Sequence, residues 1–155
     1  MENFTFSLLK PDAEIPYQLL LLADETQEAI DRYIFNSDIY LLHDGTENIA
    51  VMALYKSNNT ELEIKNIAVI ESYRSKGIGS ILMNKAKEIA KENHYKTLTV
   101  GTSDTGFQQI RFYEKNGFIK SGILKDFFVE NYSDPIYENG LQMRDMVVLS
   151  HHLTE

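Results

Sequence analysis

The stretch Arg74-Ser75-Lys76-Gly77-Ile78-Gly79-Ser80 decides the fold, because it stands between a strand-like segment and the most regular amphipathic helix of the chain. Its two glycines let the backbone pass close to a bulky anion. The N–H groups of the first helical turn then point outward unpaired, and the helix dipole adds partial positive charge. Arg74 and Lys76 bring full positive charges to the same end. The stretch therefore predicts a site for a pyrophosphate group.

Two common phosphate-binding loops do not match this stretch. A Walker loop needs a lysine followed by Ser or Thr directly after its second glycine, and Ser80 stands there instead. The dinucleotide fingerprint needs a third glycine at position 82, which is Leu82. A glycine turn that only starts a helix is the alternative that these residues leave open.

Hydrophobic periodicity on both sides of the stretch predicts one α/β domain, residues 1–155, with a mixed sheet. Apolar residues recur at helical spacing from Ile78 to Ala90, and β-rich runs flank the hairpin signal Asp44-Gly45. We find no repeat and no linker. The expected order is β-α-α-β-β-β-α-β-α-β-β, with strands over 3–9, 39–42, 49–55, 61–70, 96–100, 118–124 and 141–149, two helices within 16–34, and helices over 78–90 and 108–116.

Composition and charge exclude several classes of protein. The 155 residues contain no cysteine, which rules out disulfides and thiolate metal sites. The longest apolar run, Leu19 to Ala23, is far shorter than the ~20 residues of a membrane span, and the amino terminus shows no secretory signal. A formal net charge of −8 argues against nonspecific binding to nucleic acid. We expect a soluble, cytoplasmic protein with no nucleic-acid or membrane partner.

The charge is unevenly distributed along the chain. Residues 1–60 carry a net charge of −7, residues 61–120 carry +3, and residues 121–155 carry −4. This pattern suits a protein that holds an anion centrally and meets a cation at its flanks. Lysines that simply gather on solvated helices explain it as well.

A second motif lies downstream of the glycine turn, in Phe112-Tyr113-Glu114-Lys115-Asn116-Gly117-Phe118. With Arg-x-x-Gly-x-Gly at 74–79 and Tyr-x-x-x-Gly-Phe at 113–118, the chain resembles the GNAT superfamily of acyl-CoA-dependent N-acetyltransferases over about residues 60–120. The resemblance implies a mixed, mostly antiparallel central sheet of about seven strands with about four helices. Many members have an Asn and an Ala where this chain has Gly106 and Gln109, so contacts from that helix to the pantetheine arm are not carried over.

The resemblance also implies a site for acetyl-CoA. The family splays two parallel strands apart, and the exposed backbone edge of one pairs with the pantetheine arm. In this chain that edge is Ile67, Ala68 and Val69, with the Val69 N–H near the thioester carbonyl as an oxyanion donor. The pyrophosphate is then expected on the backbone of the glycine stretch, which comprises Arg74, Ser75, Lys76, Gly77, Ile78, Gly79 and Ser80.

Transfer of an acetyl group to an amine requires a base for the amine and an acid for the departing sulfur. The resemblance makes Tyr113 the acid; a core tyrosine on a helix face is the alternative. Glu63 is the candidate base, because it lies fourteen positions before Gly77 and this is the spacing of the catalytic glutamate in the histone-acetylating branch of the family. An exposed strand face explains the alternation of Glu63 with Leu62 equally well. The long loop 126–140 mixes carboxylates and aromatic rings, and we select Asp126, Tyr137 and Glu138 as candidate acceptor residues.

The resulting hypothesis is an N-acetyltransferase that moves an acetyl group from acetyl-CoA to a primary amine of a small cationic or peptide acceptor. We expect the amine to attack directly in a ternary complex; the absence of cysteine excludes a cysteinyl acyl-enzyme, and no metal is expected. His151-His152 is interpreted as a frayed carboxyl end. Homodimerisation through the last strands stays open, as do two rivals: a CoA-binding sensor without turnover, and a nucleotide- or phosphosugar-binding protein.

Overall fold

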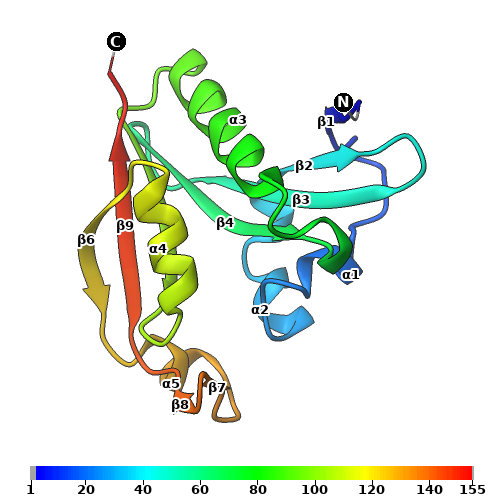
Figure 1. Ribbon diagram of the computed structural model, residues 1–155. Helices are drawn as coiled ribbons and strands as arrows, with labels where there is room; N and C mark the ends of the chain where they lie inside the picture. Colours follow the sequence, from blue (N-terminus) through cyan, green and yellow to red (C-terminus); the bar gives the residue numbers. More distant parts are fainter. Residues whose placement is uncertain (1–2, 155) are drawn as a thin grey trace.

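The computed structural model describes residues 3–154 as a sheet flanked by helices on both faces (Figure 1). Seven strands lie in the order β1-β2-β3-β4-β5-β9-β6, and every pair is antiparallel except β4 with β5. The expectation of a mixed, mostly antiparallel sheet is confirmed. The strands are β1 (Thr5–Leu8), β2 (Ser37–His43), β3 (Asn48–Lys56), β4 (Glu61–Val69), β5 (Thr97–Ser103), β6 (Ile119–Leu124) and β9 (Met146–His152).

The helices divide between the two faces of the sheet. α3 (Ile78–Glu92) and α4 (Phe107–Lys115) cover one face and bury a core that we call the α3-side core. α1 (Tyr17–Leu20), α2 (Gln27–Asp31) and the short η1 (Ile34–Asn36) cover the other face at its amino-terminal end, over a smaller α1-side core. Another short turn, η2 (Glu71–Tyr73), precedes α3. None of the described helices is long and apolar enough to cross a bilayer.

The end of the chain differs from the sequence-based expectation in two ways. The predicted strand 141–149 is divided: Leu141–Gln142 forms β8, which pairs with β7 (Tyr137–Glu138) in a separate hairpin, and the sheet strand β9 starts at Met146. The loop before that hairpin contains a further helix, α5 (Phe127–Asn131).

The interpretation of His151-His152 as a frayed end is wrong. Both residues belong to β9, where they pair with Leu98 and Thr97 of β5. The His151 ring also packs against Phe118, and its Nδ1 lies 2.9 Å from the Gly117 carbonyl oxygen. His151 and His152 are ordered because they extend the pairing of β9 with β5, and a local sequence pattern does not reveal such a pairing.

A β-bulge in β4 changes which face its side chains occupy. Leu54 of β3 pairs with Ile64 and Ala53 pairs with Asn66, so Lys65 is an extra residue. Ile64 before the bulge faces the α3-side core. After the bulge the parity is reversed, as one extra residue turns every later side chain to the opposite face. The odd-numbered residues Ile67 and Val69 now pack on the α3-side core, and Ala68 joins the α1-side core.

The parallel pair of strands separates just beyond this point. β4 and β5 are paired only from Glu61–Ile64 to Thr97–Val100. In Figure 1, β2 and β3 run across the picture whereas β9 and β6 run down it, which shows how far the two halves of the sheet turn from each other. The ends of β4 and β5 are therefore free to form the walls of a cleft.

Candidate active site

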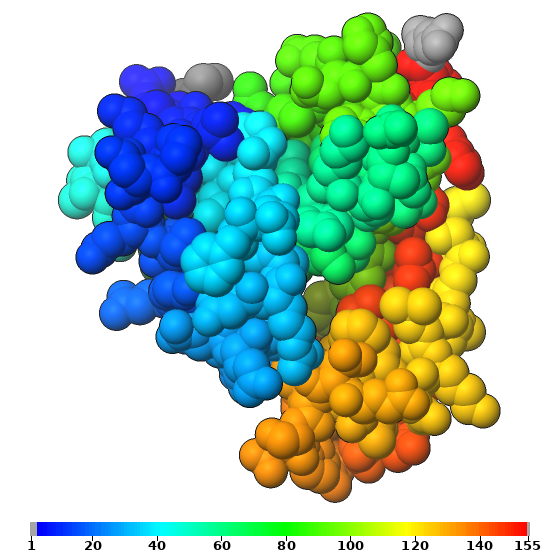
Figure 2. Space-filling model, turned by 180° about the vertical axis from the view of Figure 1, so that it is seen from behind, coloured from blue at the N-terminus to red at the C-terminus, as the bar shows by residue number. Residues whose placement is uncertain are grey.

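A cleft of about 650 Å³ opens where β4 and β5 diverge. Viewed from behind, the surface is hollowed between the α1–α2 segment in blue and the segment around α5 and β8 in orange (Figure 2). Two groups of residues line it from the strands and from α4: Ile64–Val69 and Val100–Ser103 with Arg74, and Gln108, Gln109 and Tyr113. A third group lines the part of the cleft that we call the acceptor end: 21–25, Phe128, Tyr132, Tyr137, Glu138, Met143 and Met146.

The start of α3 has the geometry of an anion site beside this cleft. Gly77 is the N-cap residue, its φ is +81° in the left-handed region, and no side chain caps the helix. Ser75 also has a positive φ, at +62°, a strained value for a residue with a Cβ. Successive backbone N–H groups in such a turn form a concave cradle for anions. The sequence indicated the glycines but gave no signal for the strained serine.

The glycine stretch divides between the cleft and its surroundings. Arg74 lines the cleft and donates from Nε to the Val69 carbonyl oxygen at 3.0 Å. Lys76 lies over the ring of Tyr73 at 5.4 Å, outside the cleft lining. Residues 75–80 form the adjoining loop and first turn of α3 and are not among the lining residues.

The free edge of β4 presents backbone groups to the cleft. The Ile70 N–H donates to the Ile49 carbonyl oxygen on β3 at 2.9 Å. In an antiparallel pair, hydrogen-bonded residues alternate with residues whose N–H and C=O point away. Val69 and Ile67 are residues of the second kind, so their amides face the side from which β5 has withdrawn. Together with Ala68 they form the edge expected to receive the pantetheine arm.

Tyr113 reaches the cleft from α4. The residue is 6% exposed, and its ring packs against Phe112 and Phe118. Burial raises the pKa of its hydroxyl to about 12 and is the only cause of the shift. Tyr113 is thus both a core residue and a lining residue, and at neutral pH it carries a proton that it can donate.

Glu63 lies in a second hollow of about 240 Å³, which Thr99, Ser121 and Ser150 also line. Its carboxylate is 3.2 Å from Nζ of Lys65 in an ion pair. The structure does not place Glu63 among the residues lining the main cleft, although Gly101 and Met146 border both hollows. Its role as a base stays a prediction.

Two of the three candidate acceptor residues line the cleft. Tyr137 and Glu138 do so from β7, and Glu138 accepts a hydrogen bond from Oγ1 of Thr105 at 3.1 Å. Asp126 does not; it forms an ion pair with Arg144 at 3.2 Å.

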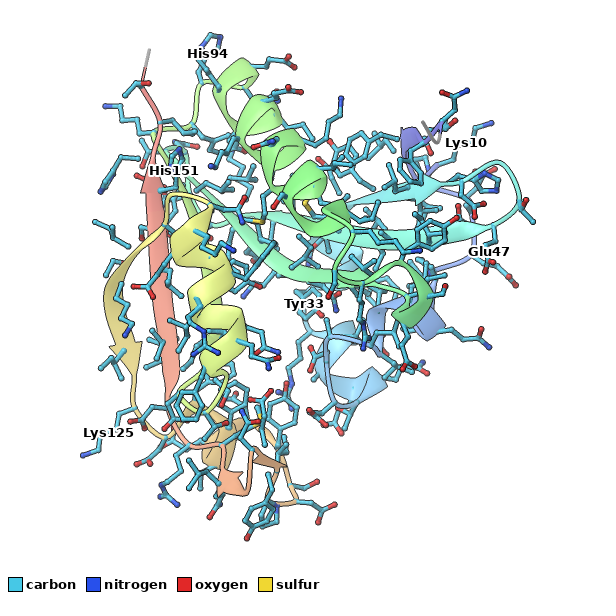
Figure 3. The ribbon with its side chains drawn as sticks, viewed as in Figure 1. Lys10, Tyr33, Glu47, His94, Lys125 and His151 are labelled. Carbon is cyan, nitrogen blue, oxygen red and sulfur yellow. The ribbon has the colours of Figure 1, made fainter. Side chains whose placement is uncertain are left out.

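A hydrogen-bond chain that the sequence did not indicate crosses the acceptor end. Nδ2 of Asn66 donates to the Tyr33 hydroxyl at 3.1 Å, and that hydroxyl donates to Oδ2 of Asp24 at 3.1 Å. The Tyr132 hydroxyl donates to Oδ1 of Asp24 at 2.6 Å from the far side of the cleft. Tyr33 lies toward the middle of the molecule (Figure 3). Burial is the largest cause that raises the pKa of both tyrosines.

Asp24 had only one signal in the sequence, as part of a polar group, Asp24-Glu25-Thr26, that precedes a short helix. Of these three residues, Thr26 caps the helix: its hydroxyl accepts a hydrogen bond from the Ala29 N–H at 3.1 Å. The Asp24 side chain is instead part of the cleft wall.

Comparison with known proteins identifies the family. The model of the acetyltransferase (GNAT) family matches residues 3–118. The uncharacterized N-acetyltransferase YvbK of Bacillus subtilis is 41% identical over 133 residues, which are 86% of this chain and 86% of that protein. The chain belongs to the GNAT family of acetyltransferases.

Solved structures of GNAT proteins agree with this assignment. A GNAT family acetyltransferase from Elizabethkingia anophelis with acetyl-CoA bound is 39% identical, with a TM-score of 0.95 over 99% of this chain and 100% of that one. A Bacillus subtilis acetyltransferase in complex with CoA is 37% identical, with a TM-score of 0.90 over 98% of this chain and 100% of that one. This GNAT chain is therefore an N-acetyltransferase, and the nucleotide- and phosphosugar-binding alternative is wrong.

Proposed function

We propose that this GNAT enzyme transfers the acetyl group of acetyl-CoA to a primary amine of a small cationic or peptide acceptor, by direct attack in a ternary complex. One observation carries the proposal: the open amide edge of β4 and the protonated phenol of Tyr113 line the same cleft. An edge that hydrogen-bonds the cofactor and an acid that meets the leaving sulfur are two of the parts that the reaction requires.

The uncapped start of α3 holds the pyrophosphate of CoA in this proposal. The N–H groups of residues 75–80 donate to it, and Lys76 adds its charge. Arg74 lies at the boundary between loop and cleft, where its guanidinium can leave the Val69 carbonyl for a phosphate oxygen. The freed Val69 edge then pairs with the pantetheine arm together with Ile67 and Ala68.

The reaction itself follows from the groups around the thioester. The Val69 N–H polarises the thioester carbonyl, and the Ile67 N–H has the same orientation two residues deeper in the cleft. The amine nitrogen attacks the carbonyl carbon, the C–S bond breaks, and Tyr113 donates its proton to the departing sulfur. Glu63 takes the amine proton through intervening water, because its hollow adjoins the cleft at Gly101 and Met146 and neither of these residues can carry a proton.

The acceptor end of the cleft is rich in carboxylates. Asp24, Glu25 and Glu138 line it, with Tyr132 and Tyr137 as ring surfaces. This charge favours a cationic acceptor. Asp126 does not line the cleft and is paired with Arg144, so it has the weakest support of the three acceptor candidates that the sequence suggested.

A thiol-release assay over a panel of amines tests the proposal. We expect CoA to appear with some of the cationic small amines, amino acids or lysine peptides, and calorimetry to show binding of acetyl-CoA but not of ATP or NAD. Acetyl-CoA binding without thiol release on any amine would support the sensor alternative instead. Cytoplasmic location and a homodimer also stay predictions; light scattering coupled to size exclusion measures the second.

A further inference from the structure

The side-chain amide of Asn66 is held in one orientation and leaves one atom unused. The residue is 4% exposed and lines the cleft. Nδ2 donates to the Leu20 carbonyl oxygen at 3.0 Å and to the Tyr33 hydroxyl. A backbone carbonyl can only accept, so the nitrogen must face Leu20 and the oxygen must turn away from it.

Oδ1 of Asn66 is the one buried side-chain polar atom within residues 3–154 that has no hydrogen-bond partner. Buried polar atoms are normally paired, and a native exception calls for an explanation such as a functional role. Because Nδ2 is occupied on the α1 side, Oδ1 is the polar atom of this side chain that is left for a ligand, and as it is itself buried, a ligand must displace part of the cleft wall to reach it.

The bulge in β4 determines on which side of the thioester this oxygen lies. Asn66 is on the α1-side face with Ala68, whereas Tyr113 belongs to the α3-side core. A cofactor lying along the edge of β4 therefore has Asn66 on one face of the sheet and Tyr113 on the other. An amine held at Asn66 would approach from the side opposite the acid that meets the sulfur.

Asp24 provides a second polar anchor near this point. Two 3.1 Å hydrogen bonds through the Tyr33 hydroxyl connect its carboxylate to Nδ2 of Asn66, so the two side chains lie close enough for one short molecule to contact both. Tyr33 and Tyr132 fix both carboxylate oxygens. Glu25 lies close enough that Asp24 and Glu138, after burial, raise its pKa.

The cations nearby do not neutralise this group. Lys65 also lines the cleft, but it is paired with Glu63, and Arg74 lies at the cofactor end beside Val69. Arg32 lies 6.0 Å from the Tyr132 ring and is paired with Glu28 at 3.6 Å. The acceptor end thus combines three carboxylates with an unpaired amide oxygen.

We propose that Oδ1 of Asn66 accepts an N–H of the reacting amine while Asp24 binds a second ammonium group of the same molecule, so that the preferred acceptors are short diamines and polyamines. The inference rests on the proposed function and adds to it two acceptor-binding residues and a substrate class.

The test compares putrescine with n-butylamine, which has the same carbon chain and lacks the second amine. We expect the wild-type enzyme to prefer putrescine in kcat/KM by at least about tenfold, the size of a hydrogen bond to a charged group. Asp24→Asn should remove most of that preference. Asn66→Ala should lower kcat/KM about tenfold for both amines. Both variants should bind acetyl-CoA in calorimetry as the wild type does, which also shows that they fold.

Glu130→Gln is the matched control, since Glu130 is an exposed acid of α5 outside the cleft lining. It should keep both the activity and the preference. Acetylation of both amines at equal efficiency, or a preference that Asp24→Asn leaves intact, would overturn this inference while leaving the acetyltransferase proposal standing. Binding of acetyl-CoA with no thiol release on any amine would overturn both.

Discussion

At the scale of single residues, the phenol of Tyr113 is the group whose chemistry follows most directly from its surroundings. Its hydroxyl is buried, and burial disfavours the phenolate, which raises the pKa to about 12. The phenol therefore stays protonated through any practical assay pH. We expect Tyr113→Phe to lower kcat by ~10²–10⁴-fold, the usual contribution of a general acid, with acetyl-CoA affinity unchanged in calorimetry.

The same pKa predicts the shape of the pH profile. An alkyl amine has a pKa of about 10.4, so kcat/KM should rise as pH increases and more acceptor is neutral. Loss of the Tyr113 proton would lower activity only as the pH approaches about 12. We expect kcat/KM not to decrease between pH 6 and about pH 10 when the released thiol is measured in quenched reactions. A fall near pH 9 that Tyr113→Phe abolishes would contradict the raised pKa.

Glu63 gives the second prediction at this scale. If it accepts the amine proton, Glu63→Gln should lower kcat by ~10²-fold or more, because the amide cannot be protonated at these pH values. Glu61→Gln is the matched control, since Glu61 borders the same second hollow two residues earlier on β4. Equal activities of the two variants in the thiol assay would show that another group, or water, accepts the proton.

At the scale of elements, the contact between α3 and α4 links the loop proposed to hold CoA to the helix that carries Tyr113. A Cβ placed on Gly79 would lie 2.9 Å from Cζ of Phe112 and 3.1 Å from Cε1. Gly79 is therefore required for close packing of the two helices, in addition to its place in the glycine stretch.

Gly79→Ala tests the packing of Gly79 against Phe112. Alanine favours a helix over glycine by about 1 kcal/mol, whereas overpacking costs about 1–3 kcal/mol. Because the Phe112 ring must move, we expect a net loss of stability, seen as a lower Tm, and a weaker Kd for acetyl-CoA. A Tm equal to or above that of the wild type would show that the ring moves away at little cost.

At the scale of the whole molecule, the cleft divides the sheet into two halves that share only a short parallel pairing between β4 and β5. Contacts of Tyr132 span the opening: its hydroxyl donates to Asp24, and Arg32 lies 6.0 Å from its ring. A ligand that contacts both walls of the cleft should therefore stabilise the whole folded chain against unfolding.

Acetyl-CoA at one hundred times its Kd should stabilise the native state by about 2.7 kcal/mol. For a chain of this size, that corresponds to an increase in Tm of about 5–10 °C. Differential scanning fluorimetry with and without acetyl-CoA measures the shift, and ATP at the same concentration is the control. An equal shift with ATP would contradict selective recognition of CoA.

The sequence by itself determined the features that neighbouring residues encode. The glycine turn, the amphipathic face of α3, the hairpin at Asp44-Gly45 and the Tyr113 motif all depend on residues within a few turns of the chain, where backbone sterics and periodicity act directly. These patterns were sufficient for the fold class, the family resemblance and the residues expected to hold CoA.

The residues at the proposed acceptor end come together through contacts between distant parts of the chain. Tyr132 meets Asp24 across 108 positions of the chain, and Asn66 meets Leu20 across 46. The bulge at Lys65 that turns Asn66 toward them depends on register with β3. Such contacts arise from how the strands pair and twist, and no short stretch of sequence carries that information. The local pattern of loop 126–140 therefore suggested Asp126 together with Tyr137 and Glu138, which do line the cleft, but it gave no sign of Asp24 and Asn66.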